Sequence, residues 1–193
     1  ANLYSRKSFS ESNEREMVAI SAEVIGSLGK GFLAHEFQHL ISTNQKDLLR
    51  RVTEDVWLNE LRSEYAVTLA GYNDIFRGSN LNKRLDTFLL DPSDSLTEWP
   101  NMLLDYGHVA MVGEYLAEQF GPEIISKTIK IEKAGVDSIN QYFQSRNLPN
   151  SFSSVFGTWL AANYLNNQHA DKRFGYQIEG FQDLKITPRQ YLF

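Results

Sequence analysis

The segment GFLAHEFQHLIS at positions 31–42 constrains this chain more than any other stretch. Apolar residues recur there at three- to four-residue spacing, which predicts an amphipathic helix over 31–43. They are Phe32, Leu33, Phe37, Leu40 and Ile41. In such a helix His35 and His39 share one face, because side chains four positions apart lie about 5–6 Å from each other. Two imidazoles so placed can bind one zinc ion at about 2.1 Å each.

Glu36 completes the pattern H-E-x-x-H, which is typical of zinc enzymes. Its side chain is displaced around the helix from the two histidines, so it is free to face the open position of the metal and to accept a proton from water. The alternative is a helix that carries two histidines as ordinary surface or core residues. A third ligand would separate the two interpretations.

That ligand is found in WLNELRSEYA at 57–66, on a second helix predicted over 53–72. Glu60 would complete a His₂Glu set and leave one position for water. Glu64 lies four residues further along the same face, where it can accept the outer ring N–H of a ligand histidine. Two glutamates at this spacing often form a solvated face, but the rest of this helix is apolar, which favours a metal site.

The remaining sequence predicts one mostly helical α+β unit. We expect a strand at 16–22, and the glycines at 26, 29 and 31 predict a mobile loop at the rim of the metal site. The segment 71–102 is turn-rich with a short helix at 81–89, and the tail 173–188 alternates as one or two strands. Further helices are predicted at 106–120, 122–133, 136–145 and 152–167.

The composition of the chain excludes several classes of protein and of binding site. The net charge of -5 among 193 residues argues against a nucleic-acid partner. No apolar run approaches the roughly 20 residues that a transmembrane helix needs, and the polar start carries no signal-peptide pattern. The chain has no cysteine, which rules out disulfides and thiolate metal sites.

The pairing of LAHEFQHLI with WLNE and SEYA resembles the gluzincin metallopeptidases, and more narrowly the hyicolysin-like family of secreted bacterial neutral metallopeptidases. The resemblance covers roughly 15–166 and extends to EREMVAIS, YLAEQFGPEII and FSSVFGTWLAANYL. It implies a zincin-like catalytic domain over 1–193, with a small upper part at about 1–45 and a helical lower part at about 46–193. It also implies a secreted or cell-surface protein whose signal or pro-segment is absent from this chain.

The resemblance further implies roles for single residues. The implied ligands of one catalytic zinc ion are His35, His39 and Glu60. Glu36 is the implied general base, Asn59 is placed behind His39, and Glu64 is placed behind His35. The family usually has Gly-Leu after its Asn-Glu, whereas this chain has Leu61 and Arg62, which predicts a change in the shape and charge of the adjoining cleft.

Gluzincins also use a tyrosine or histidine to stabilise the oxyanion, and this chain offers Tyr106 and His108. Residues two apart on a helix point about 200° from each other, so one helix cannot present both to the zinc. Tyr106 shares its face with small residues that allow close helix packing, whereas the face of His108 is typical of core packing. We therefore predict Tyr106 as the donor.

These features predict a zinc-dependent endopeptidase that acts on polypeptides. An exopeptidase of the same clan is one alternative, but it needs an acidic anchor for the substrate amine, and the nearest upstream carboxylate is Glu23. A non-catalytic protein-binding module that retains the fold is the other alternative. The sequence does not specify an oligomeric state.

Overall fold

The computed structural model describes residues 6–7, 10–12, 15, 17–18, 20 and 26–186. All regular elements within these ranges are helices, which confirms a mostly helical fold. The α+β class is not supported, because residues 173–186 form turns and part of a short 3₁₀ helix in place of the predicted strands. The strand predicted at 16–22 and the anchor residue Glu23 lie largely or wholly outside the described residues.

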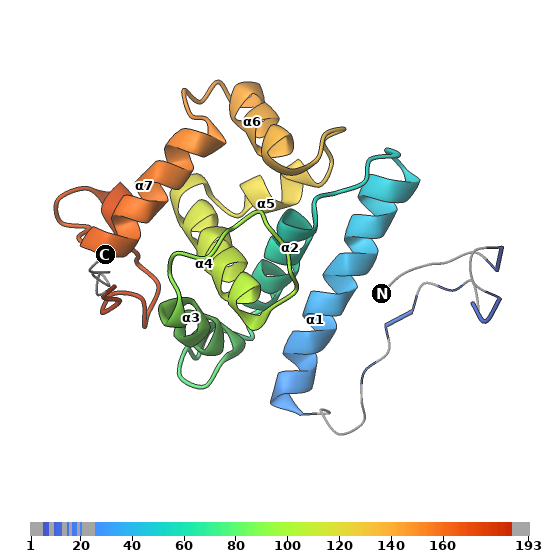
Figure 1. Cartoon of the computed structure of the whole chain (residues 1–193), viewed down its shortest axis with the longest axis horizontal. Helices are drawn as coiled ribbons and strands as arrows, with labels where there is room; N and C mark the ends of the chain where they lie inside the picture. Colours follow the sequence, from blue (N-terminus) through green and yellow to red (C-terminus); the bar gives the residue numbers. More distant parts are fainter. Residues whose placement is uncertain are drawn as a thin grey trace, which may run out of the picture.

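Figure 1 shows the arrangement of the helices. They are α1 (Ser27–Ser42), the π-helix η2 (Thr43–Leu48), α2 (Val56–Leu69), α3 (Asn80–Leu90), α4 (Leu103–Phe120), α5 (Glu123–Thr128), α6 (Gly135–Ser145), α7 (Phe152–Leu165) and the 3₁₀ helix η3 (Lys172–Phe174). None of the helices in the described part of the chain has the length and hydropathy to cross a bilayer.

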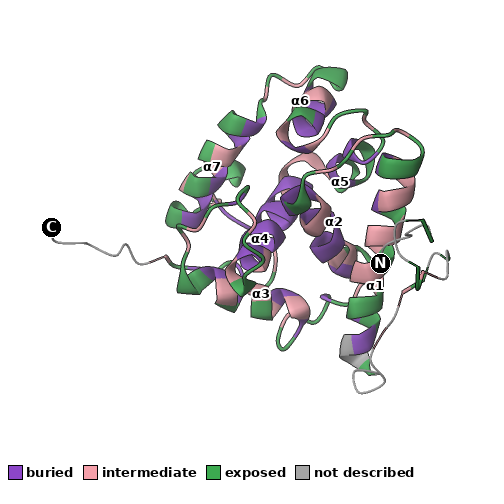
Figure 2. Ribbon diagram, turned by 45° about the vertical axis from the view of Figure 1, so that its right-hand side comes forward, coloured by how far each residue is buried: buried purple, intermediate pink, exposed green. Residues whose placement is uncertain are grey.

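Helix α4 forms the centre of the core, since it is buried along nearly its whole length (Figure 2). Helices α2 and α3 pack against it, and two glycines set how closely they approach. A Cβ atom at Gly107 would lie 2.8 Å from the backbone nitrogen of Phe88 on α3. A Cβ atom at Gly113 would lie 3.3 Å from the side chain of Leu61 on α2. These contacts bring α2, α3 and the start of α4 together.

Helix α1 lies against α2 at the edge of this core (Figure 1). Most of the apolar side chains of α1 are exposed, and His35 and His39 are among the residues that face α2. Phe32, Leu33, Phe37 and Ile41 are the exposed ones. The predicted helix is confirmed, and its contact with α2 is made by the histidine face, where His35 and His39 meet the carboxylates of Glu60 and Glu64.

The glycine-rich segment is part of this helix and does not form a rim loop. Helix α1 begins at Ser27, so Gly29 and Gly31 lie within its first turns. Gly31 is buried, and a Cβ atom there would lie 3.4 Å from the side chain of Val67 on α2. This glycine therefore permits close packing of α1 on α2.

Leu61 and Arg62 do not reach the cleft, contrary to the prediction. Both are buried, and Leu61 packs against α4. The guanidinium of Arg62 lies 2.6 Å from a carboxylate oxygen of Glu54, which also lies 3.1 Å from Nζ of Lys46. This buried network links η2 to the start of α2, on the opposite face of α2 from Glu60 and Glu64, and neither Leu61 nor Arg62 lines the cleft.

Candidate metal centre

Three side chains from α1 and α2 converge on one point. Nε2 of His35 lies 3.1 Å from Nε2 of His39. The two carboxylate oxygens of Glu60 lie 3.2 Å from Nε2 of His35 and 3.5 Å from Nε2 of His39. The three side chains are 13–14% exposed, so they are largely buried but still open to a small ion. The structure thus brings together the three predicted ligands.

These separations fit a zinc ion. An ion bound tetrahedrally at about 2.0–2.1 Å holds its ligand atoms about 3.3–3.4 Å apart. The observed spacings of 3.1, 3.2 and 3.5 Å bracket that value. A His₂Glu set also matches the donor types that zinc prefers in hydrolytic sites. The residues present therefore fit the metal in both spacing and chemistry.

The outer nitrogen of His35 is held by a carboxylate. Its Nδ1 lies 3.2 Å from Oε1 of Glu64, which is almost completely buried. A carboxylate can only accept there, so Nδ1 keeps its proton, and Nε2 is the nitrogen that would bind a metal ion. Arg84 donates to both oxygens of Glu64 at 2.7 and 2.8 Å, and Asn80 donates to one of them at 2.8 Å. Two residues of α3 thus fix the carboxylate that orients His35.

His39 is oriented by a different route from the predicted one. Its Nδ1 lies 3.1 Å from the hydroxyl of Ser63, and that hydroxyl donates to the backbone carbonyl of Asn59 at 3.1 Å. Because the only proton of Ser63 is used there, its oxygen accepts from Nδ1–H of His39, and Nε2 is the nitrogen that would bind a metal ion. The structure places Ser63 behind His39, and Asn59 contributes only its main chain.

The electrostatics of the cluster favour a cation. Burial alone would lower the pKa of His35, but hydrogen bonds to Glu60 and Glu64 outweigh it and raise the pKa to about 9. Burial alone would raise the pKa of Glu60, but hydrogen bonds from His35 and His39 lower it to about 2. At neutral pH Glu60 is therefore ionised, as a carboxylate ligand must be, and His35 carries a second proton that a bound metal ion would displace.

A cleft of about 660 Å³ opens beside this centre. His35 and Glu36 line one side of it, and Tyr106 from α4 lines another. Burial, and then the negative charge of Glu60, raise the pKa of Tyr106, so its hydroxyl keeps its proton and can donate. The hydroxyl donates to Oδ1 of Asn101 at 3.3 Å, and the ring packs under the guanidinium of Arg84 at 4.8 Å.

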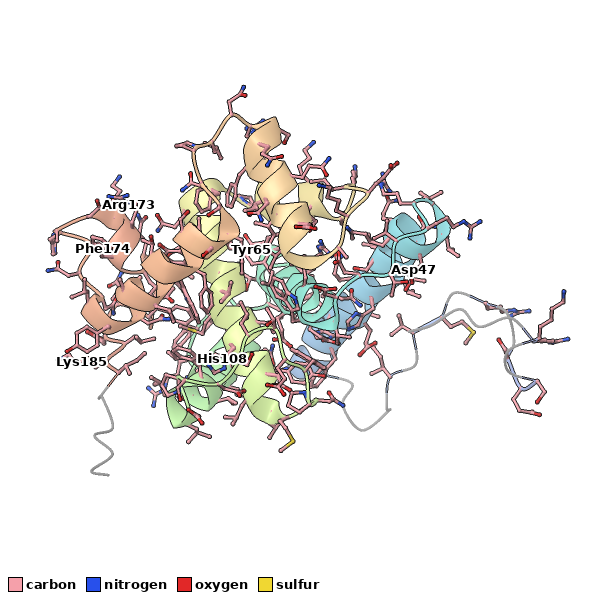
Figure 3. All side chains as sticks on the ribbon, turned by 45° about the horizontal axis from the view of Figure 1, so that its top comes forward. Asp47, Tyr65, His108, Arg173, Phe174 and Lys185 are labelled. Atoms are coloured by element: carbon pink, nitrogen blue, oxygen red, sulfur yellow. The ribbon has the colours of Figure 1, made fainter. Side chains whose placement is uncertain are left out.

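His108 lies elsewhere. It is buried where α4 meets α3 (Figure 3), with its ring 4.9 Å from that of Phe88. Its Nδ1 lies 3.1 Å from the carbonyl oxygen of Leu104 one turn earlier. It does not line the cleft. Of the two donors considered from the sequence, the structure brings only Tyr106 to the cleft.

Sequence reasoning missed Ser63, Asn80 and Arg84. Ser63 lies one residue before Glu64 and could have been found by asking which hydroxyls share the helix face of Glu60. No comparable signal pointed to Asn80 and Arg84, because the packing of α3 on α4, which brings them to Glu64, joins segments that no local pattern connects.

The comparisons with known proteins leave this geometry as the main guide. No protein-family model matches the chain, and no curated protein matches it significantly.

Proposed function

We propose that this chain is a zinc-dependent endopeptidase. The observation that carries the proposal is the convergence of three ligand atoms, all within 4.8 Å of one another, from His35, His39 and Glu60. Glu36 and Tyr106 line the adjoining cleft, so a base and a hydrogen-bond donor lie beside the proposed metal. A buried His₂Glu cluster alone would also suit a structural ion, but a structural zinc site normally has four protein ligands.

Residues of the chain itself would carry out most steps of the proposed peptide hydrolysis. A zinc ion at this centre would polarise a scissile carbonyl and make a bound water more acidic. Glu36, which lines the cleft, would act as the base that takes a proton from the attacking water and returns it to the departing amine. The Tyr106 hydroxyl donates to the carbonyl oxygen as that oxygen gains negative charge. Glu64 and Ser63 hold the two imidazoles in the tautomers that ligation requires.

An exopeptidase and a protein-binding module that retains the fold remain the alternatives, and activity decides among the three. Purified protein should contain about one zinc per chain and should cleave internal bonds of casein. Release of single terminal residues only would favour the exopeptidase. Absence of cleavage by the zinc-loaded protein would favour the binding module.

The decisive variants separate metal binding from chemistry. Glu36→Gln keeps the ligands, so zinc content should stay near one per chain while kcat falls about 100- to 10,000-fold. Glu60→Ala removes a ligand and should lose most of the zinc. Elemental analysis measures the zinc content of each variant, and a quenched-peptide assay measures its kcat. Near-normal turnover by Glu36→Gln would refute the assigned base, and full zinc content in Glu60→Ala would refute the ligand set.

A further inference from the structure

The cleft beside the metal centre is bounded on one side by positive charge. The segment after α2 and the start of α3 bring Arg77, Lys83 and Arg84 to its wall. The charge of Arg84 is already matched, because it donates to both oxygens of Glu64. Arg77 and Lys83 are exposed, and within the described part of the chain neither side chain has an ion-pair or hydrogen-bond partner.

These two charges stand out against the rest of the molecule. The chain has a net charge of -5, so two unpaired cations in this cleft have the opposite sign to the overall charge of the molecule. Exposed cations scattered over a protein surface are ordinary. Arg77 and Lys83 differ because they line one concave site beside the same metal cluster, so both act on the same bound molecule. The neighbouring wall is apolar and exposed at Ile75 and Leu103.

We infer that Arg77 and Lys83 form a subsite for a carboxylate of the peptide that occupies the cleft. The inference rests on the proposed function and names its substrate class, which is acidic peptides. A carboxylate there can come from a glutamate or aspartate side chain or from the free C-terminus of a peptide. Both sources present the same anion to the two cations, and the exposed apolar wall accommodates a neighbouring hydrophobic side chain.

The size of the expected preference for acidic peptides follows from the exposure of Arg77 and Lys83. Exposed ion pairs contribute modestly, so two of them should favour an acidic peptide over its neutral analogue by about 3- to 30-fold. The preference should shrink as ionic strength rises, because salt screens exposed charges.

Binding is tested first, without turnover. Zinc-loaded Glu36→Gln protein is titrated into heptapeptides that carry an uncharged fluorophore and differ only at the central residue, which is glutamate, glutamine or lysine. Each peptide is made with a free and with an amidated C-terminus. Fluorescence anisotropy should show that an added carboxylate tightens binding and that lysine weakens it. Dependence on the central residue assigns the subsite to a side chain, and dependence on the free C-terminus assigns it to the chain end.

A charge reversal identifies the residues. Arg77→Glu with Lys83→Glu should invert the order, so that the lysine peptide binds most tightly. Lys127→Glu with Lys185→Glu makes the same change in net charge at exposed positions outside the cleft and should preserve the order. An unchanged preference in the Arg77 and Lys83 variant, with zinc content and melting temperature intact, would overturn the inference.

Failure of the inference is distinguishable from failure of the proposed function. The same peptides are incubated with zinc-loaded wild-type protein, and products are identified by mass spectrometry. Cleavage without any acidic preference refutes the subsite and supports the peptidase. An acidic preference in binding without cleavage supports the subsite and refutes the peptidase.

Discussion

At the scale of single residues, the centre depends on which nitrogen of each histidine carries a proton. Both imidazoles have an acceptor at Nδ1, a carboxylate for His35 and a hydroxyl oxygen for His39. Each acceptor keeps a proton on Nδ1, so Nε2 is the nitrogen that would bind the proposed metal. The acceptor of His35 is charged and that of His39 is neutral, so the two imidazoles are not equivalent.

Ser63 provides a direct test of this arrangement. Ser63→Ala removes the acceptor for Nδ1–H of His39 and should weaken zinc binding about 10- to 100-fold, as loss of an outer hydrogen-bond partner does at other metal sites. Asn59→Ala is the matched control, because only its backbone carbonyl takes part, and it should keep wild-type affinity. Competition with a chromophoric chelator measures the zinc affinity of both variants. The opposite ranking would restore Asn59 as the partner of His39.

Tyr106 is the second residue to test. Tyr106→Phe removes the hydroxyl but keeps the ring under Arg84, so kcat should fall about 100- to 1,000-fold with little change in KM or zinc content. His108→Gln, in the core, is the comparison: it should lower stability and leave the kcat of the folded fraction near wild type. Steady-state assays after thermal-melt controls distinguish the two. A crippled His108→Gln beside a normal Tyr106→Phe would reverse the assignment.

At the scale of elements, the site is a product of three helices. Helix α1 supplies two of the proposed ligands, α2 supplies the third, and α3 supplies the groups that hold Glu64 in place. Arg84 is the link between them, because it binds Glu64 and also covers the ring of Tyr106. A guanidinium suits this task, since its planar fork can donate to both oxygens of one carboxylate while its face packs on an aromatic ring.

Arg84→Met should therefore affect the metal although Arg84 is not a ligand. Without its two hydrogen bonds Glu64 is held less firmly, and zinc affinity should fall about 10- to 100-fold. Asp86→Asn, an exposed change on the same helix, should have no such effect. The chelator competition is paired with circular dichroism, which shows whether α3 still folds. Wild-type affinity in a folded Arg84→Met variant would show that Asn80 alone suffices.

At the scale of the whole molecule, acidic groups are buried where the helices meet. Glu114 on α4 is one of them, and it accepts a hydrogen bond from Thr68 on α2, which in turn accepts one from Asn73. Burial and the nearby charges of Glu118 and Glu64 raise the pKa of Glu114 to about 7, although the bond from Thr68 opposes this. The core thus holds a carboxylic acid that stays protonated until near neutral pH.

This group should make stability depend on pH. Below about pH 4.5 both states carry the proton, so Glu114 has no effect; between 4.5 and 7 the unfolded state releases it first, and stability falls. The gap between 4.5 and about 7 corresponds to roughly 3 kcal/mol. Glu114→Gln should therefore lose less stability than wild type between pH 5 and pH 8, by up to about 3 kcal/mol.

Urea unfolding at the two pH values measures this difference. Glu179→Gln removes an exposed carboxylate and is the control. If Glu114→Gln and wild type lose the same free energy of unfolding between the two pH values, Glu114 does not titrate in this range in the folded protein.

The local sequence was sufficient to predict the helices and the three candidate ligands. Side chains four residues apart share a helix face whatever surrounds the helix, so His35, His39, Glu60 and Glu64 could be grouped before the fold was known. The alternating pattern at 173–188 led to a wrong prediction of strands, because a strand forms only when another strand pairs with it. In the structure Tyr176, Phe181 and Leu184 are buried between turns, and the Tyr176 hydroxyl accepts from Trp159 of α7.

Only the tertiary structure decided which groups meet across helices. It turned the histidine face of α1 toward α2 and left Phe37 in solvent, it placed Ser63 behind His39, and it brought Arg84 to Glu64. It also gathered Arg77 and Lys83 into the cleft. The physical reason is that a helix sets the spacing of its own side chains, whereas contacts between helices depend on close approaches such as those at Gly107 and Gly113, which couple residues far apart in the chain.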